Sequence, residues 1–266
     1  MNNTLDSFQR LLDIMDLLRE KCPWDKEQTF ESLRNLTIEE TYELADAIIK
    51  GDHDELKKEI GDVLLHIVFY AKIGSEQGLF DMKDVIDGLC HKLVYRHPHV
   101  FGDTTVKDQE EVKERWEELK LKEKKSDQKK KTVLGGVPDS LPAMVKANRI
   151  QQKARAVGFD WEQKEQVWDK VYEELEELKV EIASQEDKGR IEEEFGDFLF
   201  SMINVGRLYG IDPETALEKT NLKFKRRFEY LESHTIAKGI DLKTMNLAEM
   251  DVYWNEAKKL EKAKKL

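Results

Sequence analysis

The stretches IEETYELADAI at residues 38–48 and KKEIGDVLLHIVFYAKIG at residues 57–74 decide the fold prediction for this chain. In both, apolar residues such as Ile60 and Leu64 recur three or four positions apart, which is the period of an amphipathic helix. Gly51, between the two stretches, is a typical residue at which a helix stops. The pair therefore predicts a helical hairpin, and no part of the chain shows the alternation of a strand.

The ends of these helices carry weaker signals. Thr37 followed by Glu40 resembles a capping box, so we expect the first helix to begin near Ile38. The second helix is expected from about Leu56 to Ile73. Gly61 and its counterpart Gly196 fall inside predicted helices, where glycine costs about 1 kcal/mol relative to alanine. Close approach of another helix, or room for a ligand, would explain that cost.

The hairpin pattern occurs twice, which indicates two tandem copies of one helical module. The second copy reads YEELEELKVEI at residues 172–182 and IEEEFGDFLFSMINVGRLYG at residues 191–210. Three flanking blocks repeat in the same order: CPWDKEQTF (22–30) with GFDWEQKEQ (158–166), HKLVYRHPHVF (91–101) with LKFKRRFEYLE (222–232), and WEELK (116–120) with WNEAK (254–258). We therefore predict an all-α protein with an N-terminal module at 1–120, a Lys-rich and Gly/Pro linker at 121–141, and a C-terminal module at 142–266.

Composition narrows the function classes. The 266 residues carry a formal net charge of −11, which disfavours a nucleic-acid backbone as partner. The two cysteines, Cys22 and Cys90, form neither a CxxC pair nor a zinc-ligand spacing, which favours a reduced, cytoplasmic setting. The N-terminus lacks the pattern of a signal peptide, and no apolar run approaches the ~18 residues of a membrane span.

Acidic residues recur at fixed spacing in each copy: Glu40, Glu43, Glu59 and Asp62 in the first, and Glu174, Glu177, Glu194 and Asp197 in the second. Residues three apart share a helix face, so each hairpin is expected to bring four carboxylates together. Four close carboxylates repel one another unless cations neutralise them. Oxygen-only ligands select hard cations, and Mg²⁺ is the expected occupant.

A single ExxE is usually only a solvated helix face. Here the ExxE and ExxD elements occur together, in order, among apolar residues, and twice, which favours a metal site. A di-iron bundle is a weak rival because that class uses Glu-x-x-His, and no histidine here follows a glutamate by three positions. There is no GxxxxGK[ST] loop, so a triphosphate would have to be held by metal and basic side chains.

Basic residues follow each acidic pair. The second copy has Asn221, Lys223, Arg226 and Arg227 on one predicted helix, and the first has Lys92, Arg96 and His97 at corresponding positions. Such side chains can bind phosphate oxygens and offset charge on a leaving group, although a basic cluster of this kind is more often plain surface. Trp254 and Trp116 are candidates to stack on a base, or to lie in a core or an interface.

IEETYEL with KKEIGDVL, and YEELEEL with EEEFGDFL, resemble the EExxE…ExxD signature of the MazG nucleotide pyrophosphohydrolases. The resemblance covers nearly the whole chain and is to the tandem, two-domain type. It implies the all-α NTP pyrophosphatase fold, a homodimer, and Mg²⁺-dependent hydrolysis of nucleoside triphosphates to monophosphate and pyrophosphate.

The resemblance also implies roles for individual residues. The metal ligands would be Glu174, Glu177, Glu194 and Asp197. The nucleotide contacts would be Lys170, Val171, Tyr172, Glu173, Glu174, Arg190, Ile191, Glu192, Glu193, Lys223, Phe224, Lys225, Arg226, Arg227 and Trp254. The first copy keeps all four ligand positions, but its basic segment is weaker, with His97 and Pro98 where the second copy continues as helix. We therefore expect the C-terminal module to be the main catalytic one.

In the mechanism that we expect, a water attacks the α-phosphorus with Glu173 or Glu193 as its base. Lys223 and Arg227 then stabilise the departing pyrophosphate. Two other functions stay open from the sequence alone: a sensor that binds nucleotide and metal without turnover, and a structural helical scaffold. The sequence does not reveal base or sugar preference, the oligomer interface, whether the N-terminal site is active, or the cellular role.

Overall fold

The computed structural model describes residues 3–109, 111–112, 115–116, 119–120, 132–184 and 187–263. Every regular element within these ranges is a helix, which confirms the all-α prediction. The chain forms two compact units, residues 1–120 (unit 1) and 121–266 (unit 2). The first part of the predicted linker, residues 121–131, lies outside the described residues, and residues 132–142 lead by turns into the first helix of unit 2.

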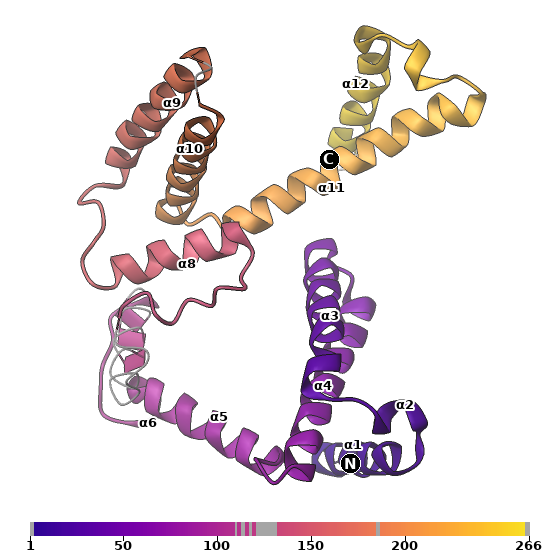
Figure 1. The fold of residues 1–266 in the computed structure, drawn as a ribbon, viewed down its shortest axis with the longest axis vertical. Coiled ribbons are helices and arrows are strands. Elements are labelled where there is room, and N and C mark those ends of the chain that lie inside the picture. The colour runs from indigo at the N-terminus through magenta and orange to yellow at the C-terminus, as the bar shows by residue number, and fades with distance from the viewer. Residues whose placement is uncertain are drawn as a thin grey trace. The chain divides into compact units, whose positions relative to one another are not determined.

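Unit 1 is built around the predicted hairpin. Its helices are α1 (Thr4–Lys21), α2 (Pro23–Lys26), α3 (Phe30–Lys50), α4 (His53–Glu76), α5 (Met82–Arg96) and α6 (Pro98–Phe101). Figure 1 shows α3 and α4 side by side, with α1 across one end of the pair and α5 leading away from α4. Gly51 ends α3 in the left-handed conformation, φ 69°, which glycine adopts without steric cost.

The expected start of α3 near Ile38 is wrong by more than two turns. The helix begins at Phe30, where Thr29 and Ser32 form a reciprocal capping box. Thr37 lies inside the helix, and its hydroxyl donates to the Leu33 carbonyl at 2.9 Å. Thr29 and Ser32 cap the helix by the same geometry that was expected of Thr37 and Glu40, so the sequence offers two capping patterns and the expectation used the wrong one.

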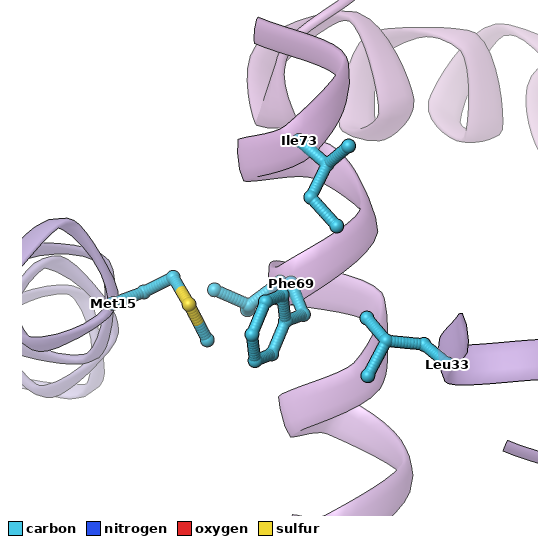
Figure 2. Packing of buried hydrophobic residues seen from close by; sticks show 5 residues of the cluster. Met15, Leu33, Phe69 and Ile73 are labelled. Atoms are coloured by element: carbon cyan, nitrogen blue, oxygen red, sulfur yellow. The ribbon is translucent and has the colours of Figure 1, made fainter. Parts of the chain in front are cut away.

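The core of unit 1 joins three helices. Met15 of α1, Leu33 of α3, and Val68, Phe69 and Ile73 of α4 are each at most 3% exposed. Figure 2 shows the Met15, Leu33 and Ile73 side chains converging on Phe69. Because these residues come from separate helices, their burial fixes the end of the α3–α4 hairpin against α1.

Unit 2 repeats this plan. Its helices are α8 (Ala143–Arg155), α9 (Val167–Ser184), α10 (Lys188–Leu208), α11 (Pro213–His234) and α12 (Leu247–Ala263), with short 3₁₀ helices η2 (Lys164–Gln166), η3 (Ile236–Lys238) and η4 (Leu242–Thr244). α9 and α10 form the hairpin, and α8 packs against α10. Figure 1 shows α11 leading away from α10, with α12 folded back along its far half.

The core of the α9–α10 hairpin is small. Val167 and Val171 of α9 pack against Val205 of α10, with Phe198 and Leu208 partly buried around them. A partly buried salt bridge supplements this packing, since Arg207 near the end of α10 pairs with Asp160 in the loop before α9. The loop that leads into α9 is therefore fixed to the opposite helix by charge as well as by apolar contact.

Within the described part of the chain, Gly61 and Gly196 do not serve close packing against another helix. A Cβ atom built on either glycine would meet no heavy atom within 4 Å, apart from the backbone of its own helix turn and its chain neighbours. The first of the two explanations expected from the sequence is therefore wrong. Room for a ligand or for another molecule is the explanation that remains.

Among the described residues, no helix combines the length and the apolar character needed to cross a membrane.

Candidate functional site

The hairpin of unit 2 brings three of its predicted ligands together. One carboxylate oxygen each from Glu174 on α9 and from Glu194 and Asp197 on α10 lie within 4.8 Å of one another. Glu174 follows the core residue Val171 by one turn, so the same helix face that buries Val171 holds its carboxylate against α10 and leaves it 6% exposed.

Unit 1 builds an equivalent group from the corresponding elements. Glu40 and Glu43 of α3 meet Glu59 of α4 with carboxylate oxygens again within 4.8 Å of one another. Glu59 is 1% exposed, which makes it one of the most deeply buried side chains of the unit. The Asp52 side chain fixes the start of α4 by accepting from the amides of Asp54 and Glu55 at 3.1 Å.

The fourth predicted ligand of each unit lies beside its group rather than inside it. Among the neighbouring charges, Asp62 raises the pKa of Glu40 most, and Glu177 raises that of Glu194 most. Neither residue belongs to the three carboxylates of its unit whose oxygens lie within 4.8 Å of one another. Each hairpin thus gives three converging carboxylates and a fourth next to them.

In each group, burial and the neighbouring carboxylates raise the pKa of one glutamate, Glu194 in unit 2 and Glu40 in unit 1. Burial raises the pKa of Glu194, and the charges of Glu177, Asp197, Glu174 and Glu193 raise it further. Burial likewise raises the pKa of Glu40, followed by the charges of Asp62, Glu43, Glu59 and Glu39. The ionised forms of these two glutamates are therefore disfavoured, and a nearby cation would stabilise them.

The donor set fits a divalent cation. The converging atoms are carboxylate oxygens, which are the ligands of hard cations. In unit 1, the Oε2 atom of Glu59 is buried and has no hydrogen-bond partner among the described residues. A buried acceptor without a partner is unfavourable, and coordination of a cation would satisfy it.

A lysine ammonium contacts each group, and the two lysines come from different helices. In unit 2, Lys170 of α9 lies 2.6 Å from Glu174 and 2.8 Å from Glu173. In unit 1, Lys58 of α4 lies 3.1 Å from Glu59 and 3.0 Å from Glu55. Sequence reasoning singled out Lys170 and missed Lys58, which precedes a ligand in the quoted motif.

The two candidate bases flank the carboxylates of unit 2. Glu173 precedes Glu174 and is paired with Lys170, whereas Glu193 precedes Glu194 and contributes to its field. The other nucleotide contacts expected near these helices lie on the same hairpin. On α9, Val171 is part of the core and Tyr172 is 62% exposed. On α10, Arg190 pairs with Glu181 at 3.0 Å, Ile191 is half-buried and Glu192 is exposed.

Within one chain, the two predicted arginines of α11 pair with a residue of α12 rather than with the carboxylates. On α11, Arg227 pairs with Glu261 of α12 at 2.7 Å and Arg226 pairs with the same residue at 3.6 Å. Trp254 of α12 packs against Phe224, with ring centroids 4.9 Å apart, and lies under Arg227. In the described part of unit 2, no ion pair joins Lys223, Lys225, Arg226 or Arg227 to the carboxylates of α9 and α10.

Unit 1 has a pair equivalent to Arg227 over Trp254. Arg96, at the end of α5, lies 5.8 Å from the ring centroid of Trp116, and the Lys120 ammonium lies 3.6 Å from the same ring. His97 and Pro98 do end the helix at this point, as the sequence suggested. The Arg–Trp pair is nevertheless common to both units, so it does not distinguish them.

A buried polar network next to the unit 1 carboxylates was not foreseen. Thr37 Oγ1 lies 2.8 Å from His66 Nδ1 and 2.5 Å from the Tyr70 hydroxyl, and burial lowers the pKa of His66. The residues are 29 and 33 positions apart, so sequence spacing gives no signal for the contact. Val171, Ser201 and Val205 occupy these places in unit 2.

Comparison with known proteins agrees with this architecture. A family model described as the MazG nucleotide pyrophosphohydrolase domain matches residues 28–101 and again residues 162–231. A nucleoside triphosphate pyrophosphohydrolase of Escherichia coli (strain K12) is 42% identical over 261 residues, which cover 97% of this chain and 99% of that protein. The nucleoside triphosphate pyrophosphohydrolase/pyrophosphatase MazG of Thermotoga maritima is 44% identical over 253 residues, or 94% of this chain and 95% of the relative.

A nucleoside triphosphate pyrophosphohydrolase of Mycolicibacterium smegmatis shares a shorter match, 38% identical over 156 residues and 48% of its own length. Both matched segments of the family model contain one of the carboxylate hairpins described above. The chain therefore belongs to the MazG nucleotide pyrophosphohydrolase family.

Proposed function

We propose that this protein hydrolyses nucleoside triphosphates to the monophosphate and pyrophosphate, with Mg²⁺ bound by Glu174, Glu177, Glu194 and Asp197. The observation that carries the proposal is the group of three converging carboxylates on a helical hairpin, with Glu177 beside it. The printed function of the Escherichia coli and Thermotoga maritima relatives supports it. Mg²⁺ is preferred because the donors are oxygens and because it binds proteins through a few carboxylates together with substrate phosphates.

The chain's own residues would act as follows. Glu173 or Glu193, each next to a ligand, would accept the proton of the attacking water. The Lys170 ammonium contacts Glu173 and Glu174. Once a divalent cation neutralises those carboxylates, this ammonium would be free to bind a phosphate oxygen. The cation supplies Lewis acidity at the phosphate and at the water. Lys223 and Arg227 would stabilise the negative charge on the departing pyrophosphate.

We also propose a homodimer, because the described part of the chain leaves apolar side chains exposed on several helices. α5 has no buried residue, and its Leu89, Val94 and Tyr95 are each about half exposed. On the unit 2 hairpin, Tyr172 and Phe195 are 62% and 52% exposed. Contiguous apolar faces of this kind are typical of interfaces. A second copy would cover them and is the simplest source of the basic helix that the carboxylates lack within one chain.

We further propose that residues 1–120 and 142–266 act as two tandem modules joined by the linker 121–141, and that the protein works in the cytoplasm. The net charge of −11 makes nucleic acid an unfavourable partner.

The deciding experiment is product analysis. The full-length chain is incubated with mixed deoxynucleoside triphosphates, with Mg²⁺ or with excess chelator, and the products are separated. We expect monophosphate and pyrophosphate only when Mg²⁺ is present. Release of orthophosphate would overturn the proposal, and binding without turnover would indicate the sensor function instead.

Substitutions assign the site. We expect Glu177→Gln or Asp197→Asn to abolish turnover and Glu43→Gln to leave most of it, whereas the opposite ranking would place catalysis in unit 1. A mixture of Asp197→Asn and Lys223→Ala chains, each inactive alone, would regain activity if the site is shared between copies. No recovery in a mixture shown to form heterodimers would exclude sharing.

A further inference from the structure

The lysine that touches a ligand comes from a different position in each carboxylate group, Lys58 on Glu59 in unit 1 and Lys170 on Glu174 in unit 2. The stretches EIGD and EFGD align Glu59 with Glu194, so Lys58 stands where unit 2 has Glu193. Unit 1 therefore carries a cation at a position where unit 2 carries an additional carboxylate. Lys170 of unit 2 corresponds to Leu36 in unit 1, so each group has one lysine against a ligand, but the two lysines hold different ligands.

The geometry shows which ligand Lys58 affects. Its ammonium lies 3.1 Å from Oε1 of Glu59, the ligand that is 1% exposed, while the lysine side chain is itself 63% exposed. The other oxygen of Glu59, Oε2, is buried without a hydrogen-bond partner in the described part of the chain. One carboxylate oxygen each from Glu40, Glu43 and Glu59 lie within 4.8 Å of one another. One side of Glu59 is thus available for a cation, and the other is already neutralised by a lysine.

We propose that Lys58 lowers the affinity of the unit 1 carboxylates for a divalent cation, because its ammonium competes with the cation for Glu59. The inference rests on the proposed function, since it requires that these carboxylates bind metal. A unit charge about 5 Å from a divalent cation, at the dielectric of water, changes the binding constant on the order of tenfold. The exposed lysine can swing aside, so tenfold is the upper end of the expected effect.

Mn²⁺ binding tests the inference without relying on turnover. The full-length chain carries Glu194→Gln and Asp197→Asn to silence unit 2, and free Mn²⁺ is measured by electron paramagnetic resonance during titration. In this background we expect Lys58→Gln to tighten Mn²⁺ binding by about three- to tenfold, and Lys58→Glu to tighten it further. Lys58→Arg keeps the positive charge, so a chain that carries it in this background should bind Mn²⁺ with the same affinity as the background alone.

Lys57→Gln is the matched control, because it removes the same charge one residue away and no described ion pair joins Lys57 to a ligand. An equal gain from Lys57→Gln and Lys58→Gln would overturn the inference, as would no gain from Lys58→Gln. Absence of Mn²⁺ binding at unit 1, even with Lys58→Glu, would overturn it too. Triphosphate hydrolysis by the unsubstituted chain is measured in parallel, so that failure of the proposed function is seen separately.

The reciprocal change provides an independent check in unit 2. With unit 1 silenced by Glu59→Gln and Asp62→Asn, Glu193→Lys should weaken Mn²⁺ binding by about three- to tenfold, and Glu192→Lys should weaken it less. Equal weakening by the two substitutions would show that only the general field matters, which contradicts the inference.

Discussion

Arg207→Met should destabilise unit 2, because Arg207 joins α10 to Asp160 in the loop before α9. Arg207 and Asp160 have side chains that are 7% and 18% exposed. The guanidinium donates to both oxygens of Asp160, one of them at 3.0 Å, and its Nε donates to Asn204 at 2.9 Å. Burial raises the pKa of Asp160, but the hydrogen bonds from Arg207 and the Trp161 backbone lower it more. The pair is therefore stabilising despite its burial.

The size of the effect follows from what the substitution leaves behind. Methionine keeps much of the apolar stem, but Asp160 stays charged and mostly buried. Removing one partner of a buried ion pair costs about 3–5 kcal/mol. Asp160 retains the Trp161 amide and Arg155 at 3.6 Å, so we expect a loss of about 2–3 kcal/mol. For a unit of this size, that corresponds to roughly 4–12 °C in Tm.

Urea unfolding of the full-length chain, followed by circular dichroism and calorimetry, measures the loss. Lys50→Met is the control, since the Lys50–Asp46 pair is 56% and 44% exposed and such pairs contribute about 0–1 kcal/mol. Because the pKa of Asp160 is lowered in the folded state, the stabilisation is present above its ordinary value of 3.8 and is lost as pH falls through the lower folded value. A loss below about 0.5 kcal/mol at pH 7, or one that persists unchanged at pH 3, would refute the reasoning.

Three other substitutions or conditions test the remaining features. Thr29→Ala removes the oxygen that accepts from the Ser32 amide and should cost about 1 kcal/mol in urea unfolding, whereas an unchanged midpoint would show that the cap is dispensable. Gly196→Ala adds a methyl where the chain has open space, and we expect a higher KM or weaker self-association; if neither changes, that space has no occupant. Because burial and neighbouring charges raise the pKa of Glu194, the metal-free chain should gain thermal stability as pH falls from 7 toward 4.5, and Mg²⁺ should abolish the gain. Equal slopes with Mg²⁺ and with chelator would contradict this.

Local spacing allowed much of the fold to be predicted. The 3.6-residue period of Ile60 and Leu64 predicted α4, and Gly51 predicted the end of α3, because both signals depend only on neighbours in the chain. The beginning of α3 was missed, since Thr37 matches a capping pattern as well as Thr29 does. The difference lies in the tertiary structure, where the Thr37 hydroxyl contacts His66 and Tyr70.

The candidate site, like the fold, could be predicted from the sequence only in part. The sequence by itself determined that Glu194 and Asp197 share a helix face and that the hairpin occurs twice, because three-residue spacing fixes a common face in any α-helix. Only the tertiary structure decided that Glu59 is buried with Lys58 on one oxygen, and that Arg227 pairs with Glu261 rather than with a carboxylate of α9 or α10. Such pairings depend on which helices pack together and at what depth, and these are set by contacts between residues far apart in the chain.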